Sequence, residues 1–131
     1  MRKTLLNILS VLAISSVPAV GFSAVHYVKA DGTGDGTSWA NAAGNLQTAI
    51  DAAQAGDEIW VAQGEYVPEK LINSTKKTSK SFILKDGVSL YGGFAGNEAS
   101  KDDRALEDVN GTKLYKNKTV LNANDEVADV W

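Results

Sequence analysis

The stretch that most constrains the fold is residues 46–68, LQTAIDAAQAGDEIWVAQGEYVP. Its apolar residues first recur at the i, i+3, i+4, i+7 spacing that places side chains on one face of a helix. These residues are Leu46, Ala49, Ile50 and Ala53. Asn45 can cap the first turn through its side-chain oxygen, and Gly56 follows the last periodic residue, where a left-handed backbone is easiest. The pattern predicts a short amphipathic helix over residues 46–53.

A buried strand is predicted after this helix at residues 59–61, with Gly64 closing it. Two other β-rich runs, at residues 88–91 and 119–121, follow at intervals of about thirty residues, which suggests stacked units. A unit this short cannot cover its own apolar face, so a neighbour must cover it, as in a solenoid.

The alternation of a strand then defines one inward column of side chains, with the helix covering its N-terminal end. The members expected in this column are Ile59, Val61, Val88, Leu90 and Leu121. The fold class predicted is mainly β, a start of stacked parallel strands with a capping helix. Because the repeat rests on three instances, an irregular small α/β domain is the alternative.

Residues 26–29 and 82–84 are two further predicted short strands, and Gly92 with Gly93 is expected to end the strand at 88–91. Three polar stretches are predicted to be loops, at residues 31–38, 69–80 and 97–117.

The glycine-rich loop at residues 31–38, DGTGDGTS, has two functional interpretations besides a structural turn. A phosphate-binding loop requires GxGxxG spacing or a GK[ST] ending, and neither is present. Asp31 and Asp35 could bind calcium, but Thr33 stands at the middle acidic position and Ala42 at the twelfth, where Glu is required. Turn chemistry is therefore the favoured interpretation.

Residues 1–23 have the layout of a secretory signal peptide: Arg2 and Lys3, an apolar run, then small residues. The run contains too many polar residues for a stable membrane span, and a buried helix or uncleaved anchor is the alternative. Cleavage after Ser23 and cleavage after Ala24 both fit. We expect residues 24–131 to be exported, to the cell surface, the extracellular space or the periplasm.

The charge pattern limits the partners. A net charge of −3 argues against nucleic acid and anionic membranes, which need clustered Lys and Arg. The basic cluster Lys76, Lys77 and Lys80 lies among Ser and Thr and is predicted to be a solvated loop. Without cysteine, the chain has no disulfide framework.

No catalytic motif is found: GxSxG and HExxH are both absent, and His26 is the sole histidine. The sequence predicts no catalytic, metal-binding or cofactor-binding residue. Four aromatic residues could form a carbohydrate-stacking surface, although buried packing is the commoner fate of such side chains. These are Trp39, Trp60, Tyr66 and Tyr91. Trp39 is expected to anchor the underside of the helix.

Two blocks, at residues 27–68 and 81–98, resemble the start of secreted right-handed parallel β-helix proteins of the pectin-lyase-like fold, which are typical of Bacteroidetes. The resemblance covers nearly all of residues 24–131. It implies a helix-capped β-helix, export, and further coils downstream in a full-length parent, so we expect this chain to be truncated. Enzymes of this fold carry their acid, base and calcium ligands on later rungs, and no residue here matches such a motif.

Three functions are compatible with this resemblance. The first is a non-catalytic secreted or cell-surface segment, structural or adhesin-like, with glycans or host and cell-surface macromolecules as partners. The second is the N-terminal cap of a polysaccharide lyase or glycoside hydrolase whose active site lies downstream. The third is a small carbohydrate-binding module. The missing catalytic set favours the first, and the chain itself is not expected to be an enzyme.

Overall fold

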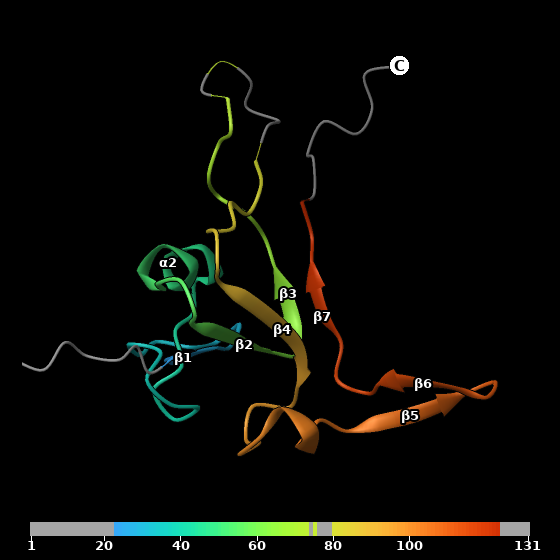
Figure 1. The fold of residues 1–131 in the computed structure, drawn as a ribbon. Coiled ribbons are helices and arrows are strands. Elements are labelled where there is room, and N and C mark those ends of the chain that lie inside the picture. The colour runs from blue at the N-terminus through green and yellow to red at the C-terminus, as the bar shows by residue number, and fades with distance from the viewer. Residues whose placement is uncertain (1–22, 74, 76–79, 124–131) are drawn as a thin grey trace, which may run out of the picture.

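The computed structural model describes residues 23–73, 75 and 80–123, and the fold is mainly β. Three parallel strands, β1 (Val25–Val28), β2 (Glu58–Ala62) and β4 (Ser89–Phe94), form one sheet in the order β1-β2-β4 (Figure 1). In its register, Ile59 lies opposite His26 on one side and Leu90 on the other. The predicted stacking of Leu90 on Ile59 is confirmed.

A second parallel pair joins β3 (Gly64–Tyr66) to β7 (Thr119–Leu121), with Leu121 opposite Tyr66. The expectation that Leu121 continues the column of Val61 and Leu90 is therefore wrong. The hydroxyl of Thr119 lies 3.0 Å from the carbonyl oxygen of Val61 and directs β7 to the end of β2. At this point Gly64, with φ +138°, turns the chain from β2 into β3. The predicted strand at residues 119–121 therefore pairs with β3, which follows the corner at Gly64, and not with the sheet of β2 and β4 that precedes it.

Helix α2 (Leu46–Ala52) forms as predicted, and the Asn45 side chain accepts from the Thr48 N–H at 3.0 Å. It ends at Ala53, whose backbone is extended, and not at Gly56. Gly56 has φ +97° in the turn before β2, where its N–H donates to the carbonyl of Gly87 at 2.8 Å. The end of the helix is thus fixed by the turn into the sheet.

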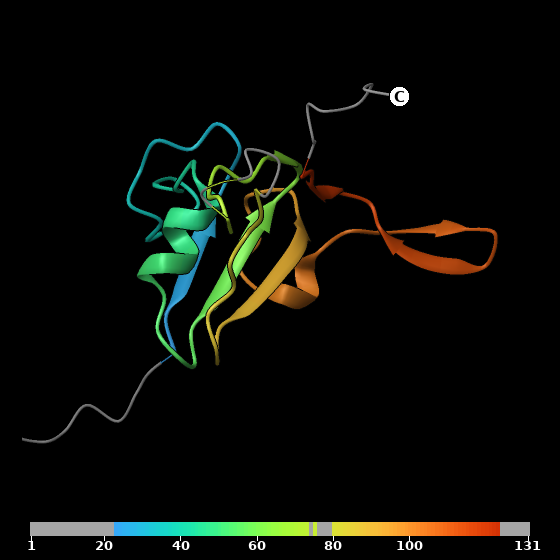
Figure 2. The ribbon, with the colours of Figure 1, turned by 90° about the horizontal axis from the view of Figure 1, so that it is seen from above.

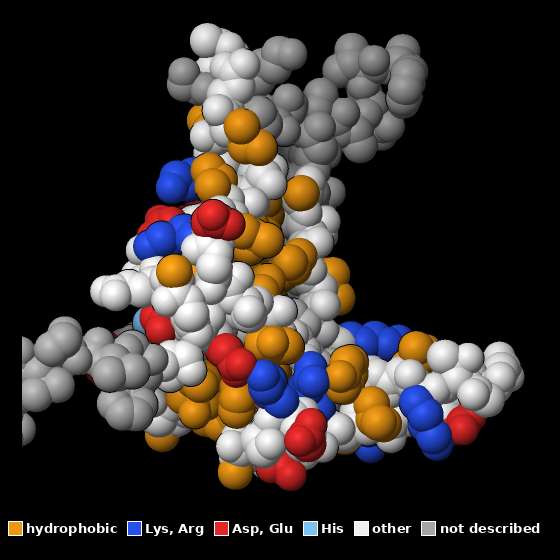
Figure 3. Space-filling view, in the orientation of Figure 1, with side chains coloured by type: hydrophobic (Ala, Val, Ile, Leu, Met, Phe, Trp, Pro, Cys, Tyr) orange, Lys and Arg blue, Asp and Glu red, His pale blue; other side chains and the backbone are white. Residues whose placement is uncertain are grey.

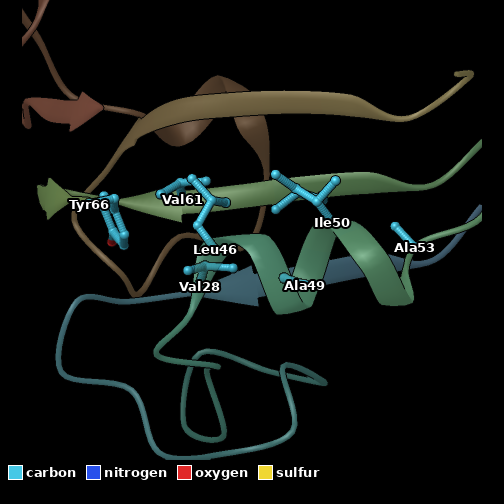
Figure 4. Packing of buried hydrophobic residues seen from close by; sticks show 8 residues of the cluster. Val28, Leu46, Ala49, Ile50, Ala53, Val61 and Tyr66 are labelled. Atoms are coloured by element: carbon cyan, nitrogen blue, oxygen red, sulfur yellow. The ribbon is translucent and has the colours of Figure 1, made fainter. Parts of the chain in front are cut away.

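The main hydrophobic core lies between α2 and the sheet (Figure 4). The predicted apolar face of the helix is buried against β1 and β2, so the amphipathic pattern is confirmed. The members of this core are Val28, Leu46, Ala49, Ile50, Ala53, Ile59, Val61 and Tyr66, with Phe82, Val88 and Leu90 packed at its margin. Fully burying a side chain such as Ile50 contributes about 2 kcal/mol, so this interface is a main source of stability.

Two strand predictions are wrong, one in the existence of the strand and one in its end. Residues 82–84 form no strand; the Gln47 side chain accepts from the Ile83 N–H at 2.8 Å and donates to its carbonyl at 3.1 Å. A helix side chain thus takes the place of a neighbouring strand. The strand at 88–91 does not end at Gly92, because β4 continues to Phe94 through a register shift against Trp60 and Ala62.

The stretch at residues 97–117 is not only a loop. It contains the 3-10 helix η1 (Lys101–Asp103) and an antiparallel hairpin, β5 (Leu106–Val109) and β6 (Thr112–Tyr115). The hairpin turn consists of Asn110 at φ +53° and Gly111 at φ +83°. Seen from above, the hairpin projects away from the rest of the molecule (Figure 2).

The predicted signal peptide spans residues 1–23, of which 1–22 lie outside the described residues, as do Lys76 and Lys77 and the tail from 124 to 131. Among the described residues, no helix has the length and apolarity needed to cross a membrane.

Candidate functional site

The sheet face opposite α2 carries a row of aromatic rings. Because side chains alternate along a strand, Tyr27 and Trp60 point away from the face that Val28 and Ile59 present to the helix. Tyr27 meets Trp60 edge-on, with ring centroids 5.6 Å apart, and Trp60 stacks on Phe94 at 4.9 Å with an interplanar angle of 11°. This row forms a second packed layer, in which Trp60 is 6% exposed.

Trp39 joins this row and does not lie under the helix, so its predicted position is wrong. Its ring is 4.9 Å from Tyr27 and 5.5 Å from Phe94, and its Nε1 donates to the carbonyl of Glu98 at 2.8 Å. The loop after β4 supplies this acceptor. Trp39 therefore ties the loop of residues 31–38 to the far side of the sheet.

Glu98 holds the loop after β4 in place. Its carboxylate accepts from the backbone N–H groups of Ala95, Gly96 and Asn97 at 2.6 to 3.1 Å. Burial acts to raise the pKa of Glu98, but these N–H donors outweigh it and the pKa is lowered. Glu98 thus remains an ionised structural anchor.

Charged side chains extend the aromatic row toward η1. Lys101 Nζ lies 2.6 Å from Glu58 Oε1 and 4.3 Å from the ring centroid of Tyr91, while Trp60 Nε1 donates to Glu58 Oε2 at 2.8 Å. The hydrogen bond from Lys101 lowers the pKa of Glu58, and the same bond raises the pKa of Lys101. Both groups are charged at neutral pH and neutralise one another.

Arg104 is a half-buried cation between η1 and β5. Its guanidinium carbon lies 4.2 Å from the ring centroid of Tyr115 and 5.1 Å from that of Phe94. Its Nη1 donates to the carbonyl of Gly92 at 3.0 Å, and its Nε donates to the carbonyl of Lys101 at 2.7 Å. Two backbone bonds and two ring faces hold this guanidinium in one orientation.

A groove of about 660 Å³ lies beside Arg104, between β4 and the segment that leads through β6 into β7. Its lining residues are Leu90, Tyr91, Gly92, Gly93, Arg104, Tyr115, Asn117, Lys118, Thr119 and Val120. Figure 3 shows hydrophobic side chains next to Lys and Arg side chains on this side of the molecule. Aromatic walls with a fixed cation can stack on a flat ring and bind hydroxyl or anionic groups.

The four aromatic residues singled out from the sequence do not meet in one site. Trp39 and Trp60 belong to the packed row, and Tyr91 lines the groove. Tyr66 lies in the core on the α2 side, where its hydroxyl donates to the carbonyl of Ala62 at 2.9 Å and burial raises its pKa to about 12.

The groove residues Arg104 and Tyr115 are not among the site residues predicted from the sequence. Both belong to residues 97–117, which composition assigned to a loop. The available signal was Asn110-Gly111 between alternating residues, which is typical of a tight hairpin turn and would have placed Tyr115 on a strand beside Arg104.

The acidic residues of the glycine-rich loop act within the turn. Asp35 Oδ1 accepts from the hydroxyl of Thr37 at 2.7 Å and from its N–H at 3.1 Å, and these bonds lower the pKa of Asp35. Within the described part of the chain, no group of three or more His, Cys, Asp or Glu residues could hold a metal ion. The structural-turn interpretation agrees with this geometry.

Comparison with protein-family models, with curated proteins and with solved structures finds no match for this chain.

Proposed function

We propose that this chain is the helix-capped beginning of a right-handed parallel β-helix and serves as an exported structural or adhesin-like module. The observation that carries this proposal is the order of the two parallel ladders. The chain passes from β2 directly into β3, and later from β4 to β7, so each later strand pairs in parallel with its earlier counterpart. The partners along β1-β2-β4 are about thirty residues apart, as one turn of a solenoid requires.

A structural role is supported by how the chemically capable side chains are used. Both indole N–H groups of Trp39 and Trp60 are bonded within the protein, and Glu58 and Glu98 are occupied by internal donors. Among the described side chains, no buried polar atom lacks a hydrogen-bond partner. Side chains bonded in this way stabilise the fold and are not free to act in catalysis. The same use of side chains agrees with the cap of an enzyme whose active site lies downstream.

The test is a surface and adhesion assay on cells that express the full chain with a C-terminal epitope tag. We expect the tag in the exported fraction and on intact cells, and binding of the purified protein to a glycan array or to host cells. Retention in the cytoplasm would refute export. Export without binding to any glycan or cell would refute the adhesin-like part and leave a structural module.

A second candidate, glycan binding, is favoured by the groove alone. Tyr91 and Tyr115 offer ring faces beside the fixed guanidinium of Arg104. Tyr115→Ala should then lose glycan binding while the fold is kept, because this side chain is half exposed on the hairpin. Leu114→Ala, its neighbour on the opposite face of β6, is the matched control. Equal binding by both variants would exclude the groove as the site.

A further inference from the structure

Asp57, in the turn between α2 and β2, binds three groups through its carboxylate. Oδ1 accepts from the backbone N–H of Ala24 at 2.9 Å, and Oδ2 accepts from the N–H of Gln54 and from His26 Nε2, each at 3.0 Å. The residue is only 8% exposed. Gln54 closes the local turn and His26 lies on the neighbouring strand, so two of these partners follow from the fold. Ala24 is different because it directly precedes β1.

Ala24 is the first residue that the β1–β2 ladder holds. Its carbonyl accepts from the N–H of Glu58 at 2.9 Å, one step before Val25 lies opposite Glu58. Both Ser23 and Ala24 are exposed, so the bond between them is accessible to a peptidase. The sequence left two cleavage positions open. Cleavage after Ser23 keeps both backbone bonds of Ala24, whereas cleavage after Ala24 removes both.

We propose that export cleaves the chain between Ser23 and Ala24, and that the freed α-ammonium group of Ala24 forms an ion pair with Asp57. Hydrolysis adds one water across this peptide bond, which leaves a carboxylate on Ser23 and an amino group on Ala24 that takes up a proton. The cleavage step rests on the proposed export. The ion pair does not, because it belongs to any form of the chain that begins at Ala24.

The positive charge of the freed amino group would lie on the nitrogen of Ala24, which already donates to Asp57 Oδ1 as a neutral amide. A charge-assisted hydrogen bond is about twice as strong as a neutral one, so the same nitrogen holds Asp57 more tightly after cleavage. The other charged groups nearby are engaged. Glu58 is paired with Lys101, and Lys85 Nζ donates to the carbonyls of Asp51 and Ala53 at the end of α2. On Asp57 itself, His26 Nε2 and the N–H of Gln54 both bind Oδ2, while the nitrogen of Ala24 binds Oδ1. Maturation would thus lock the first strand onto the turn of the second.

The cleavage step is tested by expressing the full chain with its own leader in a bacterial host and sequencing the N-terminus of the exported product. We expect the sequence Ala24-Val25-His26. A product that begins at Val25 or keeps Ser23 overturns the assigned bond. A product that remains uncleaved in the cytoplasm refutes both the proposed export and the cleavage.

The ion pair is tested on residues 24–131 by selective acetylation of the α-amino group, whose ordinary pKa of about 8 lies below that of lysine. We expect acetylation in the folded protein to be about five-fold slower than in urea, as pairing worth up to 1 kcal/mol implies. Asp57→Asn should abolish the protection, and Asp51→Asn, an exposed carboxylate on α2, should keep it. If Asp57→Asn does not fold, equal rates in the folded and unfolded wild type still overturn the ion pair.

Discussion

At the scale of single residues, Asp57 shows how one carboxylate can organise a turn and predicts how the protein responds to acid. The N–H of Gln54, then His26 and the N–H of Ala24, lower the pKa of Asp57 from 3.8 to about 2. A lowered folded-state pKa means that the ionised form stabilises the fold above the unfolded value of 3.8. This stabilisation is lost as the pH falls from about 4 through 2.

We therefore expect the free energy of unfolding to fall as the pH is lowered through this window, and Asp57→Asn to show a shallower fall. The measurement is urea denaturation at a series of pH values from 6 down to about 2. The slope cannot vanish in the variant, because Glu58, Glu98 and Asp35 also have lowered pKa values and contribute with the same sign. A variant with the wild-type slope would contradict the role assigned to Asp57.

Trp60 provides the residue-scale test of whether the aromatic row is a core or a binding surface. Trp60→Ala removes a ring that stacks on Phe94 and meets Tyr27, so it should cost about 4 kcal/mol of stability. Urea denaturation followed by circular dichroism measures this cost without relying on tryptophan fluorescence. Ile72→Ala, an exposed aliphatic control, should change stability by less than about 0.5 kcal/mol. A Trp60→Ala protein of native stability would disprove the packing role.

At the scale of elements, the hairpin β5–β6 depends on its two-residue turn. Gly111 has φ +83°, and a Cβ there would meet no atom within 4 Å, so a side chain adds backbone strain and no clash. Gly111→Ala should weaken the hairpin by about 1 kcal/mol. Because the hairpin projects from the molecule, the loss should be confined to it.

Hydrogen exchange measures this effect directly. The amides of Leu106 to Tyr115 should exchange faster in Gly111→Ala, while those of β1, β2 and β4 should stay protected. Gly111→Asn is the matched variant, since Asn tolerates the left-handed region better and should restore part of the protection. Uniform loss of protection across the sheet would show that the hairpin supports the whole fold.

The elements also show which parts of the fold the sequence could predict. Helix α2 was predictable because its apolar spacing and its Asn45 cap are local signals. The pairing of β7 with β3 was not, because it depends on the corner at Gly64 and on a hydroxyl of Thr119 that reaches back to β2. The prediction of a strand at residues 82–84 failed for a similar reason. The Gln47 side chain, which lies far away in the sequence on α2, accepts from the backbone N–H of Ile83.

The candidate site was less predictable than the fold. Aromatic residues could be recognised in the sequence, but not the face of the molecule on which each would lie. Alternation on β2 separates Trp60 from Val61, and the Gly64 corner sends Tyr66 back into the core. Arg104 gains its position from backbone carbonyls at Gly92 and Lys101, which no local pattern reveals.

At the scale of the whole molecule, the described strands leave two free edges on the same side. In the described residues β4 pairs only with β2, and β7 pairs only with β3, so the outer edge of each can accept another strand. Val120 on β7 is 47% exposed and borders the groove between these edges. An exposed strand edge with apolar side chains promotes edge-to-edge pairing, which in a β-helix the next coil would satisfy.

We therefore expect residues 24–131 to associate as their concentration rises from about 10 μM to 1 mM, as light scattering after size-exclusion chromatography would show. Val120→Lys should suppress this association, because a lysine on a strand edge resists pairing with a second edge. Leu114→Lys is the matched control, since Leu114 is 46% exposed but lies on the paired hairpin away from these edges. Equal suppression by both variants would point to general surface hydrophobicity. A protein that stays monomeric throughout would show that the groove and its bonds already protect the edges, as Arg104 at Gly92 and Thr119 at Gly93 do in part.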